Sequence, residues 1–109
     1  MNFEVIATEP FERKLRKLNK KYKSLQEDLL PIVSTLEVNP TLGTPIGKEC
    51  FKIRVAISSK GKGTSGGGRL ITLVRIVNKK VFLLDLYDKA DQENIYDKML
   101  LNLISYLEN

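Results

Sequence analysis

Histidine and tryptophan are absent from this 109-residue sequence, and Cys50 is its only cysteine. Without histidine the chain cannot form a Ser–His or Cys–His catalytic pair. With one cysteine it can form neither an internal disulfide nor a zinc site built from histidine and cysteine. A lone cysteine is typical of a reducing compartment, so we expect a cytoplasmic protein. Any acid–base chemistry must use lysine, arginine, tyrosine, aspartate or glutamate.

Long apolar runs are also missing. No stretch approaches the roughly 20 apolar residues that a membrane-spanning helix needs, and residues 1–9 carry two acids and no base, unlike a secretory signal. Hydrophobic residues make up 42% of the chain, which is enough for one core. We therefore expect a single domain, residues 1–109, without a membrane partner.

The net charge of +5 is unevenly distributed. Residues 12–23 hold seven bases and one acid, and residues 48–80 hold nine bases and one acid, whereas six acids follow from Asp85 onward. A basic centre suggests a polyanionic partner such as nucleic acid. The alternative is a charged surface that only keeps the protein in solution, and composition does not choose between the two.

Alternation of apolar and polar residues predicts strands, of which the clearest begins at Phe51. A tight turn at Asn78 and Lys79 should join the last two strands. The predicted strands span residues 2–8, 51–58, 69–77 and 80–87.

Apolar spacings of three and four predict a helical hairpin that follows Thr8 and ends near Asn39, with a break at residues 19–23 and a kink at Pro31. Another helix is expected over residues 91–107, and a loop over residues 41–48. The fold class is therefore α+β: N-terminal strand, helical hairpin, three-stranded antiparallel meander and C-terminal helix, with the helices on one sheet face.

Three basic residues are candidates for a phosphate site. Lys52 and Arg54 should point the same way from one strand, about 7 Å apart, and can hold neighbouring phosphates. Arg69 opens the next strand and should lie beside them, unless the register slips by one residue. Three cations on one face repel one another, which favours an anionic ligand. The alternative is a set of solvated surface charges.

The segment 58–68 is polar and holds five of the seven glycines. It is unlike a P-loop, in which Gly-Lys-Ser/Thr precedes a helix, because a strand follows here. We expect a mobile loop. Through Lys60 and Lys62 it either lies along a nucleic-acid backbone or is a hairpin tip without a ligand.

Two tyrosines are candidate proton carriers in a chain without histidine. Tyr87 stands near the end of the last predicted strand, beside Lys89, and Tyr96 lies in the predicted helix that follows. The alternative for either tyrosine is a buried ring whose hydroxyl is satisfied within the protein.

Taken together, these segments resemble the core of RelE/HigB-type toxins of the RelE/ParE superfamily, in the order FKIRV, KGKG, GGRLI and LLDLYDK. The similarity extends over nearly the whole chain and includes GTPIG at residues 43–47. It implies the toxin of a type II toxin–antitoxin system with the RelE-like fold. Such a toxin enters the ribosomal A site, cleaves the bound messenger RNA, inhibits translation and is blocked by a cognate antitoxin.

The resemblance also implies site residues. Ala90 stands where some ribosome-dependent members have an arginine, a role left open to Lys60, Lys62 or Lys89. The residues at matching catalytic positions are Lys52, Arg54, Arg69, Lys89 and Tyr96. The candidate RNA contacts are Lys60, Lys62, Arg75 and Tyr87.

The implied enzyme is a metal-independent endoribonuclease without a small-molecule cofactor. The ribose 2′-OH attacks the adjacent phosphorus and leaves a 2′,3′-cyclic phosphate and a free 5′-OH. Arg54 and Arg69 could hold the phosphate oxygens. Either Lys52 or Tyr96 could accept the 2′ proton. The candidates for protonating the leaving oxygen are Lys89, Arg69 and Tyr87.

Two other functions remain open on the same fold, because fold alone does not decide function. One is poisoning of DNA gyrase, as in the ParE branch. The other is a noncatalytic module that binds nucleic acid or an antitoxin.

Overall fold

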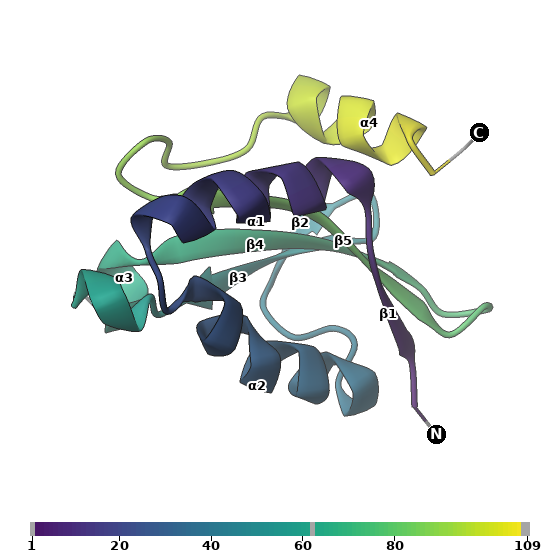
Figure 1. Ribbon diagram of the computed structural model, residues 1–109. Coiled ribbons are helices and arrows are strands. Elements are labelled where there is room, and N and C mark those ends of the chain that lie inside the picture. Colours follow the sequence, from purple (N-terminus) through teal and green to yellow (C-terminus); the bar gives the residue numbers. More distant parts are fainter. Residues whose placement is uncertain (1, 62, 108–109) are drawn as a thin grey trace.

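The computed structural model describes residues 2–61 and 63–107, so Lys62, one of the predicted RNA contacts, lies outside the described residues. A mixed sheet of five strands, in the order β1-β5-β4-β3-β2, forms the centre of the molecule (Figure 1). The strands are β1 Glu4–Ala7, β2 Thr44–Gly47, β3 Cys50–Val55, β4 Gly68–Arg75 and β5 Lys80–Asp88. The helices are α1 Glu9–Lys21, α2 Leu25–Val38, α3 Gly63–Gly66 and α4 Asp97–Ser105, with a 3-10 helix, η1, at Ser58–Lys60.

The predicted antiparallel meander is confirmed. β3 pairs with β4 and β4 with β5, and the tight turn at residues 76–79 closes with a hydrogen bond from the Lys79 N–H to the Ile76 carbonyl. β1 extends the sheet in parallel with β5, with Val5 opposite Val81. The meander therefore forms from neighbouring segments, whereas β1 joins it from the other end of the chain.

The predicted helical hairpin is also confirmed as α1 and α2. Thr8 is the residue before α1, in an extended conformation, with Pro10 in the first turn. Its side chain does not cap the helix; the hydroxyl instead donates to the Leu83 carbonyl of β5, at 2.8 Å. This bond fixes the start of α1 against the sheet. α2 continues through Pro31, whose carbonyl accepts a hydrogen bond from the Thr35 hydroxyl.

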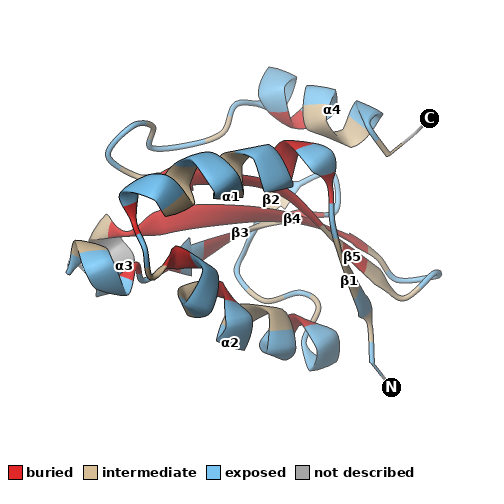
Figure 2. Ribbon diagram, in the orientation of Figure 1, coloured by how far each residue is buried: buried red, intermediate tan, exposed pale blue. Residues whose placement is uncertain are grey.

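Helices pack on both faces of the sheet, so the prediction that they share one face is wrong. Phe11 of α1 and Leu29 of α2 pack with Leu70 on one face, whereas Leu100 of α4 packs with Ile71 on the other. The physical reason is that β4 is apolar on both sides and buried from residue 68 to residue 74, so each face needs a cover. Figure 2 shows these buried strands between helices whose outer surfaces are exposed.

Three further expectations are corrected. Residues 44–47, expected as a loop, form the edge strand β2, where Pro45 is tolerated because an edge strand has a free side. α4 begins at Asp97, six residues later than expected, so Tyr96 precedes the helix. The segment 58–68, expected as a loop, contains η1 and α3, and Ser58 is bound to the Asp28 carboxylate through both its N–H and its hydroxyl; the mobility of this segment stays a prediction.

Gly67 marks a close approach of two backbones where the chain enters β4. A Cβ atom at this position would lie 2.0 Å from the Val55 carbonyl oxygen. We predict that Gly67→Ala lowers the free energy of unfolding by about 1–3 kcal/mol, because the backbone must move apart. Urea denaturation measures the loss. Gly61→Ala is the control, since a Cβ there meets no atom within 4 Å and only the positive φ of 73° is strained. Equal losses in both variants would contradict the close approach.

Candidate active site

The predicted basic face exists. β3 and β4 pair with Arg54 directly opposite Arg69 and Lys52 opposite Ile71. Ile53, between the two cations on β3, belongs to the core beneath α1 and α2. Because side chains alternate along a strand, Lys52, Arg54 and Arg69 therefore lie on the opposite face, which α4 partly covers. The predicted register is confirmed.

A third strand extends this arrangement. Tyr87 of β5 lies opposite Arg69, so Arg54, Arg69 and Tyr87 form one row across three strands, which we call the cationic row. The row depends on a β-bulge: Thr72 pairs with Leu83, but Ile71 pairs with Asp85, and one residue of β5 is skipped. Without the bulge, Arg69 would lie opposite residue 86, and Tyr87 would fall out of the row.

The cationic row runs from the surface into the interior. Arg54 is exposed, whereas Arg69 and Tyr87 are each only 3% exposed. The Arg69 guanidinium donates to the carbonyl of Gly68, at 2.9 Å. The alternative of solvated surface charges is therefore wrong for Arg69, whose side chain is buried within the protein.

Lys52 is held by a residue that the sequence analysis did not single out. Its ammonium group donates to the Asn94 side-chain carbonyl, at 3.0 Å. Asn94 belongs to residues 91–96, between β5 and α4, and this contact brings the segment over the basic face. No local pattern marks Asn94, since the contact joins residues 42 positions apart.

The hydroxyl of Tyr87 is buried, and among the described residues it neither accepts nor donates a hydrogen bond. The alternative of a buried ring whose hydroxyl is hydrogen-bonded within the protein is therefore wrong for Tyr87. An unsatisfied buried polar group costs about 1–3 kcal/mol. Burial raises the pKa of Tyr87, an effect that Arg69 partly offsets. The phenol is therefore protonated at neutral pH. Tyr96, by contrast, is 74% exposed.

A buried carboxylate that the sequence analysis also missed ends β5. Asp88 accepts a hydrogen bond from the Tyr22 hydroxyl on one oxygen, at 2.6 Å, and from the Lys60 ammonium and the Ala90 N–H on the other. Burial raises the pKa of Asp88, but these hydrogen bonds outweigh burial and lower the pKa to about 2. Lys60, predicted as an RNA contact, thus has an anionic partner within the protein, and its side chain is only 10% exposed.

The remaining predicted residues lie at different distances from the row. Lys89 follows β5 directly, and its N–H donates to the Gly67 carbonyl, two residues before Arg69. Arg75 lies at the opposite end of β4 and forms an ion pair with Glu49, at 2.9 Å. The structure thus brings Lys52, Arg54, Arg69 and Tyr87 onto one face, with Lys89 near one end, and it does not bring Arg75 to them.

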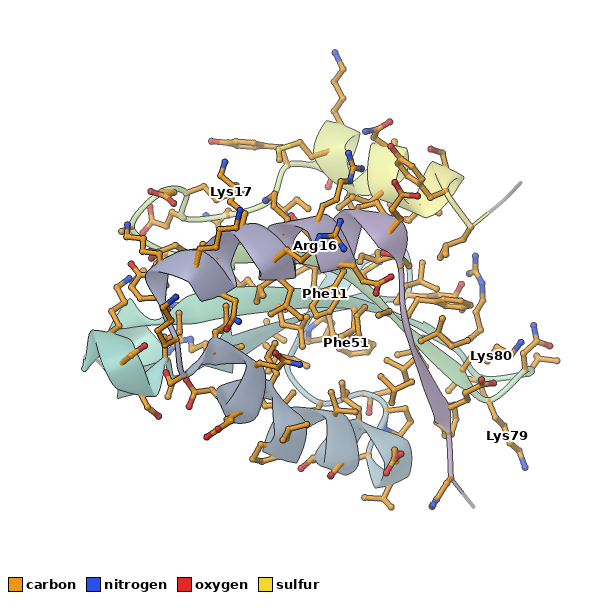
Figure 3. All side chains as sticks on the ribbon, in the orientation of Figure 1. Phe11, Arg16, Lys17, Phe51, Lys79 and Lys80 are labelled. Atoms are coloured by element: carbon orange, nitrogen blue, oxygen red, sulfur yellow. The ribbon has the colours of Figure 1, made fainter. Side chains whose placement is uncertain are left out.

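A cavity lies away from the cationic row. It has a volume of about 330 Å³ and lies between α1 and α4, and none of the row's residues lines it. Figure 3 shows Phe11 and Phe51 directed into the core, and Arg16 and Lys17 directed outward from α1. In the described part of the chain, no helix has both the length and the apolar character needed to cross a bilayer.

Comparison with known proteins assigns the chain to a family. The family model described as the RelE toxin of the RelE/RelB toxin–antitoxin system matches residues 5–105. This match covers most of the chain, so the protein is a toxin of a toxin–antitoxin system. It belongs to the RelE family, whose toxins cleave messenger RNA and inhibit translation.

Solved structures agree on the fold. A double arginine-to-alanine mutant of the Escherichia coli toxin RelE, in the free state, is 16% identical over 96% of this chain and 97% of its own, with a TM-score of 0.62. The RelBE2 toxin–antitoxin complex of Mycobacterium tuberculosis matches with 17% identity over 81% and 99%, and a TM-score of 0.56. The Escherichia coli mutant in complex with an antitoxin peptide matches with 16% identity over 94% of each chain, and a TM-score of 0.52.

The ionisation of Asp88 predicts how stability depends on pH. Its pKa is about 2 in the folded protein, against an ordinary value of 3.8. The stabilisation is therefore complete above about pH 4 and is lost as the pH falls toward 2. We predict that the wild-type free energy of unfolding falls across this window by about 2 kcal/mol more than that of Asp88→Asn. Urea denaturation at each pH measures both, and parallel curves would contradict the prediction.

Proposed function

We propose that this toxin cleaves messenger RNA on the ribosome, in the cytoplasm, by attack of the ribose 2′-OH and without a metal ion. A cognate antitoxin would neutralise it between episodes of stress. The observation that supports the proposal is the cationic row, with Arg54 exposed at its outer end and Lys52 two residues away on the same face. This surface suits an RNA backbone, whose phosphates bind basic side chains.

The electrostatics of the row favour an anion. Like charges directly opposite one another on paired strands destabilise the pair, and Arg54 and Arg69 are such a pair. Among the described residues, no ion pair includes Arg54. A phosphate bound by the exposed guanidinium would relieve the repulsion. It would also be held by two parallel hydrogen bonds, as arginine and phosphate prefer.

The proposed reaction moves two protons. The 2′ oxygen forms a bond to phosphorus as the bond from phosphorus to the 5′ oxygen breaks, leaving a 2′,3′-cyclic phosphate and a 5′-OH. Lys52 and Tyr96 are the candidates to accept the 2′ proton. Tyr87, protonated at neutral pH, Lys89 and Arg69 are the candidates to protonate the leaving oxygen. Arg54, with Arg69 behind it, would stabilise the charge that develops on the phosphate.

Arg54→Ala tests this proposal most directly. Removing one group that stabilises the transition state lowers a cleavage rate about 100-fold or more, whereas an exposed substitution changes stability by only about 0.5 kcal/mol. We therefore predict loss of growth arrest on induction, with an unchanged thermal melt. Primer extension on cellular messenger RNA measures the cleavage.

Arg16→Ala is the matched control, since it removes the same charge from the exposed outer side of α1. Equal loss of cleavage in both variants would indicate a general effect of charge and contradict a site at the row. Growth arrest with blocked DNA supercoiling and intact messenger RNA would instead support a gyrase poison. RNA binding without a cyclic-phosphate product would support a noncatalytic module.

A further inference from the structure

The buried carboxylate of Asp88 connects three parts of the chain that are distant in sequence. Tyr22 lies between α1 and α2, Lys60 ends η1, and Ala90 follows β5, and all three donate hydrogen bonds to this one side chain. The Lys60 ammonium also lies 5.7 Å from the centre of the Tyr22 ring. The side chain of Asp88 is fully buried, so these donors replace the water that it loses.

The same residue shapes the backbone turn that follows β5. Its side chain accepts the Ala90 N–H at 2.9 Å, and its carbonyl accepts the N–H groups of Asp91 and Gln92 at 3.0 and 3.3 Å. Lys89 lies inside this turn, and its own N–H is bound to the Gly67 carbonyl at 3.1 Å. The backbone of Lys89 is thus fixed on both sides.

The turn also determines where the next segment goes. Residues 91–96 leave the turn and carry Asn94 to the ammonium group of Lys52, at 3.0 Å. Asp88 therefore helps to fix two features of the basic face. One is the position of Lys89, and the other is the path of the segment whose Asn94 binds Lys52. Buried ion pairs add little net stability, because desolvation offsets their attraction, but they fix geometry.

We infer that Asp88 is a positioning residue for RNA cleavage, which acts by holding Lys89 in place beside the cationic row. This inference rests on the proposed function. Asp88 faces the side of the sheet opposite the row, since it pairs with Gly68 while Tyr87 pairs with Arg69. It therefore does not contact the RNA, and it acts through the main chain of the turn.

A double-mutant cycle tests the inference, with Asp88→Asn, Lys89→Ala and the two combined. The readouts are single-turnover cleavage of ribosome-bound messenger RNA and binding of a 2′-deoxy analogue, which lacks the attacking hydroxyl. We expect Asp88→Asn to slow cleavage about 10- to 100-fold, as a misplaced catalytic group does, with binding unchanged within about twofold. In the Lys89→Ala background the same change should have almost no effect.

Several outcomes would overturn it. Effects that multiply in the double variant, an inert Lys89→Ala, or a loss of binding as large as the loss of rate would each show that Asp88 does not act through Lys89. Wild-type cleavage with an unaffected Asp88→Asn variant rejects this inference alone. If the wild-type protein leaves messenger RNA intact, the proposed function fails, and this inference fails with it.

Two further variants separate positioning from folding. Asp88→Asn combined with Lys60→Gln replaces the ion pair by neutral amides, so that no charge is left buried without a partner, and we expect the same slow cleavage in a folded protein. Asp28→Asn is the matched control, because Asp28 anchors η1 through Ser24 and Ser58 but does not contact the turn at Lys89.

Hydrogen exchange provides a readout that does not depend on activity. Exchange at the Lys89 and Ala90 amides should quicken in Asp88→Asn while the amides of central β4 stay protected, and in Asp28→Asn the Lys89 and Ala90 amides should remain as in wild type. If Asp28→Asn slows cleavage as much as Asp88→Asn, or if the Lys89 amide exchanges equally in both, general loosening explains the result and the positioning role is wrong.

Discussion

The register between β3 and β4 is the constraint on which the basic face depends. Side chains alternate between the two faces of a strand, so a shift of one residue would place Arg54 opposite Leu70 and carry Arg69 under α1 and α2. Apolar matching on the other face resists that shift, because Ile53 pairs with Leu70 within the core. The close contact of Gly67 with the Val55 carbonyl adds a second restraint at the strand end.

Basic side chains near the candidate site differ in whether their charge is neutralised within the protein. Asp88 and Lys60 neutralise each other within the protein, whereas Arg54 remains at the surface with its charge directed to solvent. Some of the bases in the sequence, such as Lys60, therefore form ion pairs within the protein and are not available to bind a ligand. Net charge alone overstates the surface that a nucleic acid can bind, and the position of each base has to be known.

Several features could be predicted from the sequence because they depend on neighbouring residues. The alternation from Phe51 gave β3 and its basic face, and apolar spacing gave α1 and α2. Other features depend on contacts between distant residues. The bulge that aligns Tyr87 with Arg69 leaves no local pattern, and the burial of Lys60 follows from Asp88, 28 residues away. Gly43, Pro45 and Gly47 predict a loop, because these residue types have low strand propensity. The strand β2 forms there because the segment pairs with the edge of β3.

The parallel pairing of β1 with β5 has a consequence for how the protein is made. Residue 4 lies opposite residue 80, so β1 must wait for β5 to be synthesised before the sheet is complete. Such long-range pairing slows folding, because a long loop has to close before the contact stabilises it. The cationic row and Lys89 likewise come together only when residues 54 to 89 have been synthesised. A nascent chain therefore cannot complete the sheet, or the candidate site on it, before residues 80 to 89 have left the ribosome.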